Sequence, residues 1–310
     1  MNLKILLTGK NGQIGHELSR LLPQLGEVVA VDFDELDLLK PEEIRRAIRS
    51  VHPNLIVNAA AFTAVDQAET DRAAALAVNA GAPTVMAEEA KKIGAALVHF
   101  SSDYVFDGSK SVPYEEDDPP NPLSYYGKTK LAGDLAIQNS GVPHLIIRTA
   151  WVYGTWGKNF LLTILRLATQ REEIRIVKDQ TGAPTWSREI AAATMRILNQ
   201  LSGGESAIAS LSSLGGIYHL TAAGATNWSE FAQAILDLAG QASASASWFT
   251  AATEGRPIIA RRIIPITTAE YSTAARRPAY SVLSNLRCRR TFGFALPDWK
   301  AQLQSAMTQP

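Results

Sequence analysis

The sequence lacks the features that mark secreted, membrane-spanning or nucleic-acid-binding proteins. It has one cysteine, Cys288, which has no partner for an internal disulfide. Its 30 Lys and Arg balance 30 Asp and Glu, so there is no electrostatic reason to expect nucleic acid or an anionic membrane as a partner. The longest apolar run, near LIVNAAAFTAV, is about half of the roughly 20 residues that span a membrane, and no basic leader precedes Gly9. We therefore expect a soluble protein of the reducing cytoplasm.

The N-terminal half alternates between short apolar segments and helical patterns. LKILLTG, GQIGHELSRLL and EVVAVD predict a strand, a helix and a strand. Further strands are expected at Leu55–Asn58, Ala96–Ser101 and Leu145–Arg148. Strands that are apolar on both faces are typical of a parallel sheet covered by helices. The sequence predicts an α/β protein with a Rossmann-like, doubly wound parallel sheet.

The alternation loosens after Thr149. Helices are expected at 159–169 and 187–200, a strand near 174–177, and a last helix entered through Pro297. We expect a large unit over 1–150 and a smaller α/β unit over 151–310, with some later segments returning to the edge of the first sheet. Two small-residue stretches, 202–216 and 243–247, are expected to be flexible surface loops.

Three glycines follow the first expected strand and open the first helix in TGKNGQIG. Gly9 permits a tight turn, Gly12 lets the backbone approach a pyrophosphate, and Gly15 lets the helix pack closely on the strand. The N-terminus of the helix offers free N–H groups to the anion. A glycine-rich turn without a ligand is the alternative, and the spacing is G-x-x-G-x-x-G. We expect a dinucleotide site in the large unit, formed by Gly9, Lys10, Asn11, Gly12, Gln13, Ile14 and Gly15.

Two charged residues near this loop give opposite indications about the dinucleotide. Asp32 ends the second expected strand, where its carboxylate would accept from the adenosine ribose and repel a 2′-phosphate. Lys10, within the loop, would attract that phosphate or would simply be solvated. NADPH and NADH both remain possible, and NADPH is the cofactor that we expect first.

A polar residue followed by three alanines ends the third expected strand. Asn58, Ala59, Ala60 and Ala61 would lie at the carboxyl edge of the sheet, where ligands of such sheets bind. Small side chains there leave room for a flat ring. Close helix packing is the alternative, and we favour cofactor binding.

The stretch LSYYGKTKLAGDLAI has two adjacent tyrosines before a lysine. Asn121 and Pro122 predict a helix start, so the stretch should be helical. Tyr126 and Lys130 are then four residues apart on one face. A nearby ammonium group would lower the pKa of a phenol, which is near 10 in water. We therefore expect Tyr126 and Lys130, and not Tyr125, to act in catalysis.

The strand that ends in FSSDYVF delivers two serines to the same edge of the sheet. Ser102 is expected to hydrogen-bond a ketone oxygen while Tyr126 protonates it. Ser101 is expected to point into the packing, because successive side chains of a strand face opposite ways. Asp103 and Tyr104 would lie at the mouth of the site, where Asp103 would orient a substrate hydroxyl or cap a turn.

These motifs resemble the extended short-chain dehydrogenase/reductases. Over nearly the whole chain, GKNGQIG, VNAAAFTAVDQAE, SSDYVFDG, NPLSYYGKTKLAG, RTAWVYG, DQTGAPT and FGFALPDW are similar to the dTDP-4-dehydrorhamnose reductase family. The resemblance implies NADPH- or NADH-dependent reduction of the C4 ketone of dTDP-4-dehydro-6-deoxy-L-mannose to dTDP-L-rhamnose. The substrate, a nucleotide sugar, would lie near Trp151 and the segment from Asp179 through Pro184 to Thr185. Many members have threonine at the position of Ser102, and serine keeps the hydroxyl.

Two other functions remain open. An epimerase or dehydratase of the same superfamily would use the same Tyr126 and Lys130 with a retained cofactor. Relatives of this reductase also serve as non-catalytic nucleotide-binding subunits, although a lost tyrosine or lysine would then be expected, and both are present.

Some members of the family form dimers through Mg²⁺ held by glutamates. The resemblance places those positions at Glu17, at or beside Arg188, and at Lys300, with Glu189 as a substitute for the second. A cation at the other positions would repel Mg²⁺, which needs oxygen ligands. We expect no metal and favour a monomer, with a weak metal-free homodimer as the alternative.

Overall fold

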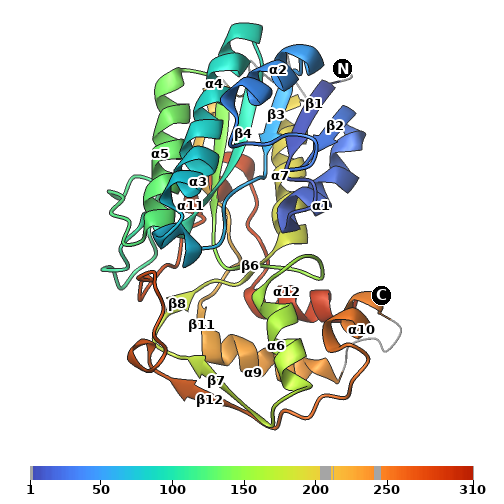
Figure 1. Cartoon of the computed structure of the whole chain (residues 1–310), viewed down its shortest axis with the longest axis vertical. Coiled ribbons are helices and arrows are strands. Elements are labelled where there is room, and N and C mark those ends of the chain that lie inside the picture. Colours follow the sequence, from blue (N-terminus) through green and yellow to red (C-terminus); the bar gives the residue numbers. More distant parts are fainter. Residues whose placement is uncertain (1–2, 203–210, 212, 241–245, 310) are drawn as a thin grey trace.

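The structure is a computed structural model that describes residues 3–202, 211, 213–240 and 246–309. It has a larger upper part around one sheet and a smaller lower part (Figure 1). The loops expected at 202–216 and 243–247 fall mostly outside the described residues.

The described residues of the upper part contain a six-stranded sheet in the order β2-β1-β3-β4-β5-β10. All of its neighbouring strands run parallel. Its strands are β1 (Leu3–Thr8), β2 (Gly26–Val31), β3 (Leu55–Asn58), β4 (Ala96–Ser102), β5 (His144–Thr149) and β10 (Gly216–His219). The last of these joins the edge at β5, so a later segment does return to the first sheet. The predicted doubly wound parallel sheet is confirmed.

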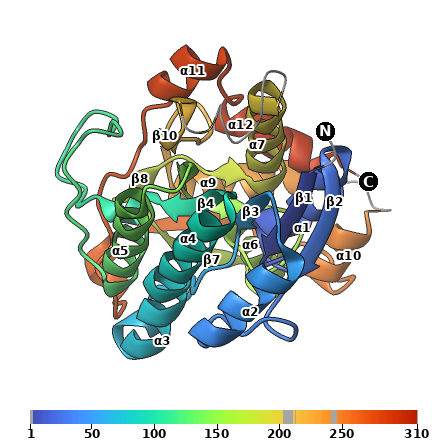
Figure 2. The same cartoon turned by 90° about the horizontal axis from the view of Figure 1, so that it is seen from above.

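Helices cover both faces of this sheet (Figure 2). One core lies under α2 (Pro41–Val51), α4 (Ala82–Ile93) and α5 (Tyr125–Ser140). The other lies under α1 (Gln13–Leu21), α7 (Ser187–Ser202) and α11 (Leu286–Phe292). Shorter helices lie in the connections: η1 (Leu22–Gln24), η2 (Gln67–Glu69), α3 (Arg72–Leu76), η3 (Ala77–Gly81) and η4 (Asp103–Val105). Because both faces are buried, the strands are apolar throughout, as the sequence predicted.

The lower part has its own core and, among the residues that the structure describes, three short strand pairs. The pairs are β6 (Val152–Tyr153) with β9 (Thr185–Trp186), β7 (Glu173–Val177) with β12 (Arg262–Ile266), and β8 (Thr181–Gly182) with β11 (Thr226–Asn227). The helices are α6 (Phe160–Ala168), α9 (Trp228–Ala239), α10 (Ser247–Thr253) and α12 (Trp299–Met307), with the turn η5 (Thr268–Glu270). Their apolar faces form one cluster that includes Phe231 and Trp299.

The starts of two helices differ from the sequence prediction. Helix α5 begins at Tyr125, because the Ser124 hydroxyl accepts from Gly127 N at 3.1 Å and caps it. Asn121 donates to the Asp107 carboxylate at 2.9 Å and does not cap this helix. Helix α12 begins at Trp299, two residues after the predicted entry through Pro297, and the Asp298 side chain caps it.

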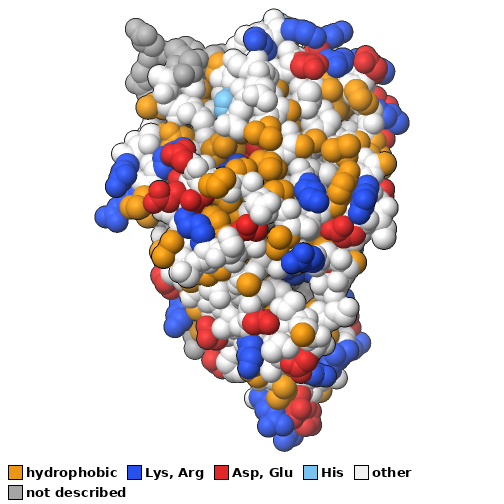
Figure 3. Space-filling model, turned by 90° about the vertical axis from the view of Figure 1, so that its left-hand side faces the viewer, with side chains coloured by type: hydrophobic (Ala, Val, Ile, Leu, Met, Phe, Trp, Pro, Cys, Tyr) orange, Lys and Arg blue, Asp and Glu red, His pale blue; other side chains and the backbone are white. Residues whose placement is uncertain are grey.

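The surface drawn in Figure 3 carries acidic and basic side chains interspersed, with no large area of one sign. Within the part of the chain that the structure describes, no helix has both the length and the apolar character needed to cross a membrane. The same residues contain no cluster of three His, Cys, Asp or Glu that would hold a metal ion.

Candidate functional site

The glycine loop packs directly against the end of β3. Gly9 has a φ of 78°, and a Cβ on it would lie 2.7 Å from Ala60 N. A Cβ on Gly15 would lie 1.9 Å from the Gly9 carbonyl oxygen. Only glycine fits either position, so the loop stays close to β3 while α1 begins at Gln13, directly after Gly12, with no side-chain cap. The first N–H groups of α1 are therefore available to an anion.

A cavity of about 360 Å³ runs from this loop along the carboxyl edge of the sheet. Of the residues predicted to bind the cofactor, the ones that line it are Gly9, Asn11, Gly12, Gln13, Ile14, Asp32, Ala59, Ala60, Ala61, Tyr126 and Lys130. Lys10, Gly15 and Asn58 are not among its lining residues. The structure thus brings the glycine loop and the Tyr-Lys pair to one cleft.

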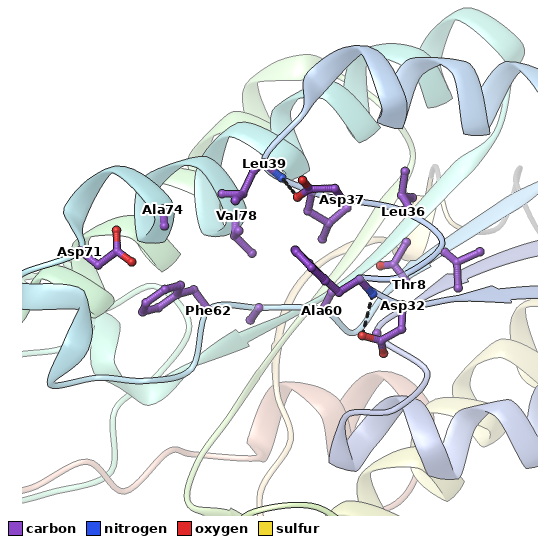
Figure 4. A pocket seen from close by; sticks show the side chains of 15 residues that line it. Thr8, Asp32, Leu36, Asp37, Leu39, Ala60, Phe62, Asp71, Ala74 and Val78 are labelled. Atoms are coloured by element: carbon purple, nitrogen blue, oxygen red, sulfur yellow. Dashed lines mark hydrogen bonds between the residues drawn. The ribbon is translucent and has the colours of Figure 1, made fainter.

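A second cavity, of about 370 Å³, continues beyond Asp32 (Figure 4). Its wall is mostly apolar and includes Leu36, Phe62 and Val78. A flat, apolar ring fits a wall of this kind.

The charged groups between the two cavities are already engaged. Asp32 accepts from Asn11 N and from Phe33 N, both at 2.8 Å. Lys10 forms an ion pair with Glu35, whose other oxygen accepts from Asp32 N at 2.8 Å. The hydrogen bond from Lys10 lowers the pKa of Glu35 below its usual value. Lys10 is therefore not simply solvated, and the sequence analysis missed Glu35.

Asn58 lies beneath the cleft and does not line it. It is fully buried, and its Oδ1 accepts from Thr8 Oγ1 at 2.8 Å and from Ala60 N at 3.2 Å. Its Nδ2 lies 3.1 Å from His99 Nδ1. Asn58 thus supports the alanine segment that forms the wall of the cleft.

Lys130 is buried beside Tyr126, and its Nζ is held by β4. Nζ donates to the Phe100 carbonyl at 2.7 Å and lies 3.1 Å from His99 Nε2. Burial lowers the pKa of Lys130 to about 8, although Asp134 acts in the opposite direction. His99 was missed in the sequence analysis, although a histidine within the apolar segment ALVHF was a visible signal.

The expected lowering of the tyrosine pKa by Lys130 is wrong for this structure. Burial raises the pKa of Tyr126 to about 12, and hydrogen bonding to Ser102 only partly opposes the shift. Nearby Asp103 and Asp134 also raise it. The charge of Lys130 does not dominate, because Nζ is engaged by the strand and the phenol is desolvated.

The two serines at the end of β4 have different partners. Ser101 donates to Asp134 at 2.9 Å, and Arg148 donates to the same carboxylate oxygen at 3.1 Å. Ser102 accepts from Tyr104 N at 3.1 Å and donates to Asp103 at 3.0 Å. Ser101 is therefore part of a buried ion-pair network, but it also lines the first cavity, contrary to the prediction that it points only into the packing. Ser102 does not line that cavity and instead lies beside the Tyr126 hydroxyl.

Asp103 and Tyr104 are more enclosed than a position at the mouth of the site implied. Asp103 is buried, and burial raises its pKa to about 6. The Tyr104 ring meets Tyr126 edge to face, with the centroids 5.4 Å apart. Both residues therefore shape the surroundings of Tyr126.

Trp151 has a left-handed backbone with a φ of 47°, which is strained for a bulky residue. Its ring stacks on Trp228 with centroids 3.5 Å apart, and a Cβ on Gly182 would lie 2.4 Å from it. Trp228 lines a third cavity, of about 590 Å³, together with Phe160 and Gln180. Trp151 thus borders that cavity through its partner ring.

Two other residues expected near the substrate have structural partners. Asp179 is exposed, and its carboxylate accepts from the Thr268 backbone N at 2.8 Å and from its hydroxyl at 2.7 Å. Pro184 is buried between β8 and β9. Neither lines the three cavities described above.

A segment that the sequence analysis passed over crosses the glycine loop. Trp156 stacks on His16 with centroids 4.3 Å apart, and its Nε1 donates to the Asn11 carbonyl at 3.0 Å. The next two residues, Gly157 and Lys158, line the first cavity. This segment adds a cation to the glycine-loop end of the cleft. Its contact with Asn11, 145 positions earlier, could not be read from local patterns.

The chain matches the family described as RmlD substrate binding domain over residues 3–310. It is similar to the dTDP-4-dehydrorhamnose reductase of Burkholderia thailandensis, with 49% identity over 298 residues and 96% of each chain covered. The solved dTDP-4-dehydrorhamnose reductase of Clostridium acetobutylicum has 34% identity and a TM-score of 0.85, with 98% of each chain covered. That of Bacillus anthracis, solved in complex with NADP, has 32% identity and a TM-score of 0.84, with 99% of each covered.

Proposed function

Because this chain belongs to the dTDP-4-dehydrorhamnose reductase family, we propose that it reduces the C4 ketone of dTDP-4-dehydro-6-deoxy-L-mannose to dTDP-L-rhamnose. The reaction is the last step of dTDP-rhamnose biosynthesis and takes its hydride from NADPH or NADH. The observation that carries the proposal is the hydrogen bond of Ser102 to Tyr126, because Tyr126 lines the cleft that the glycine loop opens. We also infer that the enzyme works in the cytoplasm.

The residues of the cleft fit a nicotinamide dinucleotide. The glycine loop and the N-terminus of α1 suit the pyrophosphate, and Lys158 adds a positive charge beside them. The apolar cavity beyond Asp32 suits the adenine ring, and Asp32 the adenosine ribose (Figure 4). When bound, the reduced cofactor supplies the hydride.

Tyr126 is the proton donor of the proposed reaction. Its pKa of about 12 keeps the phenol protonated at neutral pH, so it can give its proton to the oxygen of the reduced carbonyl. Ser102 hydrogen-bonds that oxygen, and Lys130 would hold the nicotinamide ribose. The buried surroundings exclude water and strengthen these hydrogen bonds.

The third cavity would take the nucleotide part of the substrate. Its aromatic wall of Phe160 and Trp228 suits a base or a sugar. Arg171, Arg175 and Arg277 also line it and favour the diphosphate. Trp151 supports this wall by its stack on Trp228. We therefore infer that most of 151–310 binds the substrate and that 1–150 binds the cofactor, with α7, β10 and α11 completing the cofactor unit.

One assay tests the function against its superfamily alternatives. The purified enzyme is given dTDP-4-dehydrorhamnose with NADPH or NADH, and oxidised cofactor and dTDP-rhamnose are quantified together. Equal amounts of both products, over many turnovers, are expected. An epimerase or dehydratase would instead turn over without net cofactor oxidation, and a regulatory subunit would bind without turnover.

We infer that the enzyme is a monomer. Glu17 is buried, and Lys300 lies over the Trp299 ring at 5.5 Å, so these groups offer no set of oxygen ligands for Mg²⁺. Arg188 faces the Trp186 ring, and Glu189 is half-buried beside it. Light scattering after size exclusion, with Mg²⁺ and then with EDTA, should give a mass near 33.5 kDa in both buffers. A dimer that dissociates only on chelation would contradict the inference.

A further inference from the structure

A chain of buried polar groups connects the end of β1 to the active-site lysine. Thr8 Oγ1 donates to Asn58 Oδ1 at 2.8 Å, and Asn58 Nδ2 lies 3.1 Å from His99 Nδ1. On the far side of the ring, His99 Nε2 lies 3.1 Å from Lys130 Nζ. Asn58, His99 and Lys130 are all at most 1% exposed. Water is therefore kept from these contacts, and each group must satisfy its neighbour.

The orientation of the Asn58 amide is fixed by its other partners. Ala60 N and Thr8 Oγ1 both donate to Oδ1, which places the amide nitrogen toward His99. An amide N–H only donates, so His99 Nδ1 must be the acceptor. Burial lowers the pKa of His99 well below its usual value and keeps the ring neutral, and a charged Lys130 would lower that pKa further. The one proton of the neutral ring must then be on Nε2.

This tautomer has a consequence for Lys130. The Nε2–H group points at Nζ, which already donates to the Phe100 carbonyl at 2.7 Å. A neutral amine can accept the Nε2–H through its lone pair, but an ammonium group has only donors. The contact is favourable for the amine and repulsive for the ammonium.

The other ionisable groups around Nζ do not remove this conflict. Asp134, one turn along α5, favours the ammonium, but its carboxylate is shared with Arg148 and Ser101. The phenol of Tyr126 is neutral at physiological pH. His99 is thus the group that decides whether Nζ donates or accepts on the β4 side.

We propose that His99 is a positioning residue that sets the charge of Lys130. With the ring proton on Nε2, Lys130 is held as a neutral amine. When Lys130 takes up a proton from solvent, the ring proton of His99 moves from Nε2 to Nδ1. The Asn58 amide then flips, so that its Oδ1 accepts the hydrogen bond from Nδ1–H. The imidazole stays neutral throughout, so Nζ gains the only net proton.

These coupled changes at Lys130, His99 and Asn58 form a switch that also affects the wall of the cofactor cleft. When the Asn58 amide turns over, Ala60 N loses Oδ1 as its acceptor, and Ala60 lines both cavities of the cleft. The charge of the lysine and the backbone of the cleft wall are therefore coupled. The significance of this coupling for reduction rests on the proposed function, whereas the switch itself does not.

Nitrogen-15 NMR of the purified full chain, with labelled histidine, tests the switch without substrate or cofactor. Protonated and unprotonated ring nitrogens have well-separated shifts, and the signals of His99 are those lost in His99→Gln. Above the pKa of Lys130, His99 should have its proton on Nε2. As the pH falls through about 8, the proton should move to Nδ1.

Two other histidines are internal controls in the same spectrum. Nδ1 of His144 lies 2.8 Å from the Val142 carbonyl, and Nδ1 of His219 lies 3.1 Å from the Tyr114 carbonyl. Both rings should keep the proton on Nδ1 across this pH range, because a carbonyl can only accept.

Two variants should hold His99 in opposite tautomers at every pH. Asn58→Asp places an acceptor against Nδ1, so His99 should keep its proton there at every pH. Lys130→Met removes the titrating group, so the proton should stay on Nε2. A wild-type His99 with the same tautomer from pH 6 to 10, or an inversion that persists in Lys130→Met, would overturn the proposal. Once His99 is assigned, the wild-type spectrum can overturn the proposal by itself, so the test remains decisive even if Asn58→Asp or Lys130→Met fails to fold.

Discussion

At the Tyr126 end of the cleft the ionisable side chains are buried, whereas at the Asp32 end they are exposed to solvent and paired. Lys130 is 1% exposed and its pKa is lowered to about 8. The side chains of Lys10 and Glu35 are 30% and 47% exposed and form an ion pair. Burial raises the free-energy cost of a charged side chain at the Tyr126 end, whereas solvent screens the charges at the Asp32 end. Substitutions should therefore have large effects on chemistry at the buried end and small effects on affinity at the exposed end.

The largest effect is expected for Tyr126→Phe. Loss of the proton donor should lower kcat by roughly 10²-fold or more. The Kd of the cofactor should change little, because the ring is kept. Steady-state kinetics and a cofactor titration measure the two quantities.

Tyr125→Phe is the matched control for that variant. The Tyr125 ring packs under the Arg72 guanidinium at 5.1 Å, away from the cleft, so kcat should stay close to the wild-type value. A larger loss in Tyr125→Phe than in Tyr126→Phe would reverse the assignment of the donor.

Asp103 should make the buried end sensitive to pH. Its pKa is raised by burial from 3.8 to about 6, so the stability that it contributes is present below pH 3.8 and lost as the pH rises through 6. Asp103→Asn does not titrate. The difference in free energy of unfolding between Asp103→Asn and wild type should therefore shift in favour of the variant by about 2–3 kcal/mol from pH 4 to pH 7.5. Urea unfolding at the two pH values measures this difference.

Asp107, in the same loop, provides a control of opposite sign. The backbone hydrogen bond from Ser109 holds the pKa of Asp107 below its usual value. The stability that Asp107 contributes is present above pH 3.8 and lost as the pH falls below that value, so Asp107→Asn should lose little further stability relative to wild type between pH 4 and 7.5. If the stability of Asp107→Asn relative to wild type instead rises in this range, as that of Asp103→Asn should, burial does not explain the behaviour of Asp103.

Trp151, which is half-buried, should give an intermediate effect that two variants can separate. Trp151→Ala and Trp151→Gly both remove the stack on Trp228 and should raise the KM for the nucleotide sugar by a similar factor. Glycine also relieves the left-handed backbone, so Trp151→Gly should be more stable than Trp151→Ala by about 1 kcal/mol. Kinetics and thermal unfolding measure the two effects. An unchanged KM with a large loss of stability in both would show a packing residue only.

The smallest effects are expected at the exposed end. Lys10→Ala should weaken NADPH binding more than NADH binding, because Lys10 pairs with Glu35 beside Asp32, where the adenosine ribose is proposed to bind. Glu35→Gln should instead favour NADPH by releasing Lys10. Both changes should be about two- to fivefold in the ratio of the two Kd values, since exposed charges are screened. Fluorescence titration with each cofactor measures the ratio.

Asp34→Asn is the matched control for Glu35→Gln. It removes the same charge from an exposed neighbour, so any general effect of charge would appear in both. Equal ratios in the two variants would mean that the ion pair with Lys10 does not influence the choice of cofactor.

The sequence predicted the parts of the site that depend on neighbours along the chain. The glycine spacing placed Gly15 correctly because its close contact with Gly9 lies within one strand–turn–helix unit. The positive φ of Gly9 is also local, although the approach of Ala60 that leaves no room for a side chain there is not. The helical spacing placed Tyr126 and Lys130 together for the same reason. The predicted cap of α5 was wrong because the Asn121 side chain donates to the Asp107 carboxylate, and Ser124 caps the helix instead. A local signal therefore fails when another segment binds the side chain.

The remaining parts depend on contacts between distant segments. The carboxylate of Asp179 is bound by Thr268, which lies 89 residues later in the chain. His99 lies in a strand buried on both faces, so alternation could not show which way its ring points. The lowered pKa expected for Tyr126 was wrong because spacing alone does not reveal desolvation.

The return of β10 to the edge beside β5 has a consequence for how the chain folds during synthesis. The core that covers Leu18 of α1 is completed by α7 and then by Cys288 and Phe292 of α11. The glycine loop therefore leaves the ribosome early, but the apolar face of α1 stays exposed to solvent until nearly the whole chain has been made. Such non-local contacts slow folding and leave apolar surface exposed to aggregation. A chain that stops at residue 150 would contain the cofactor motif and still lack the residues that bury α1, so it should aggregate instead of folding.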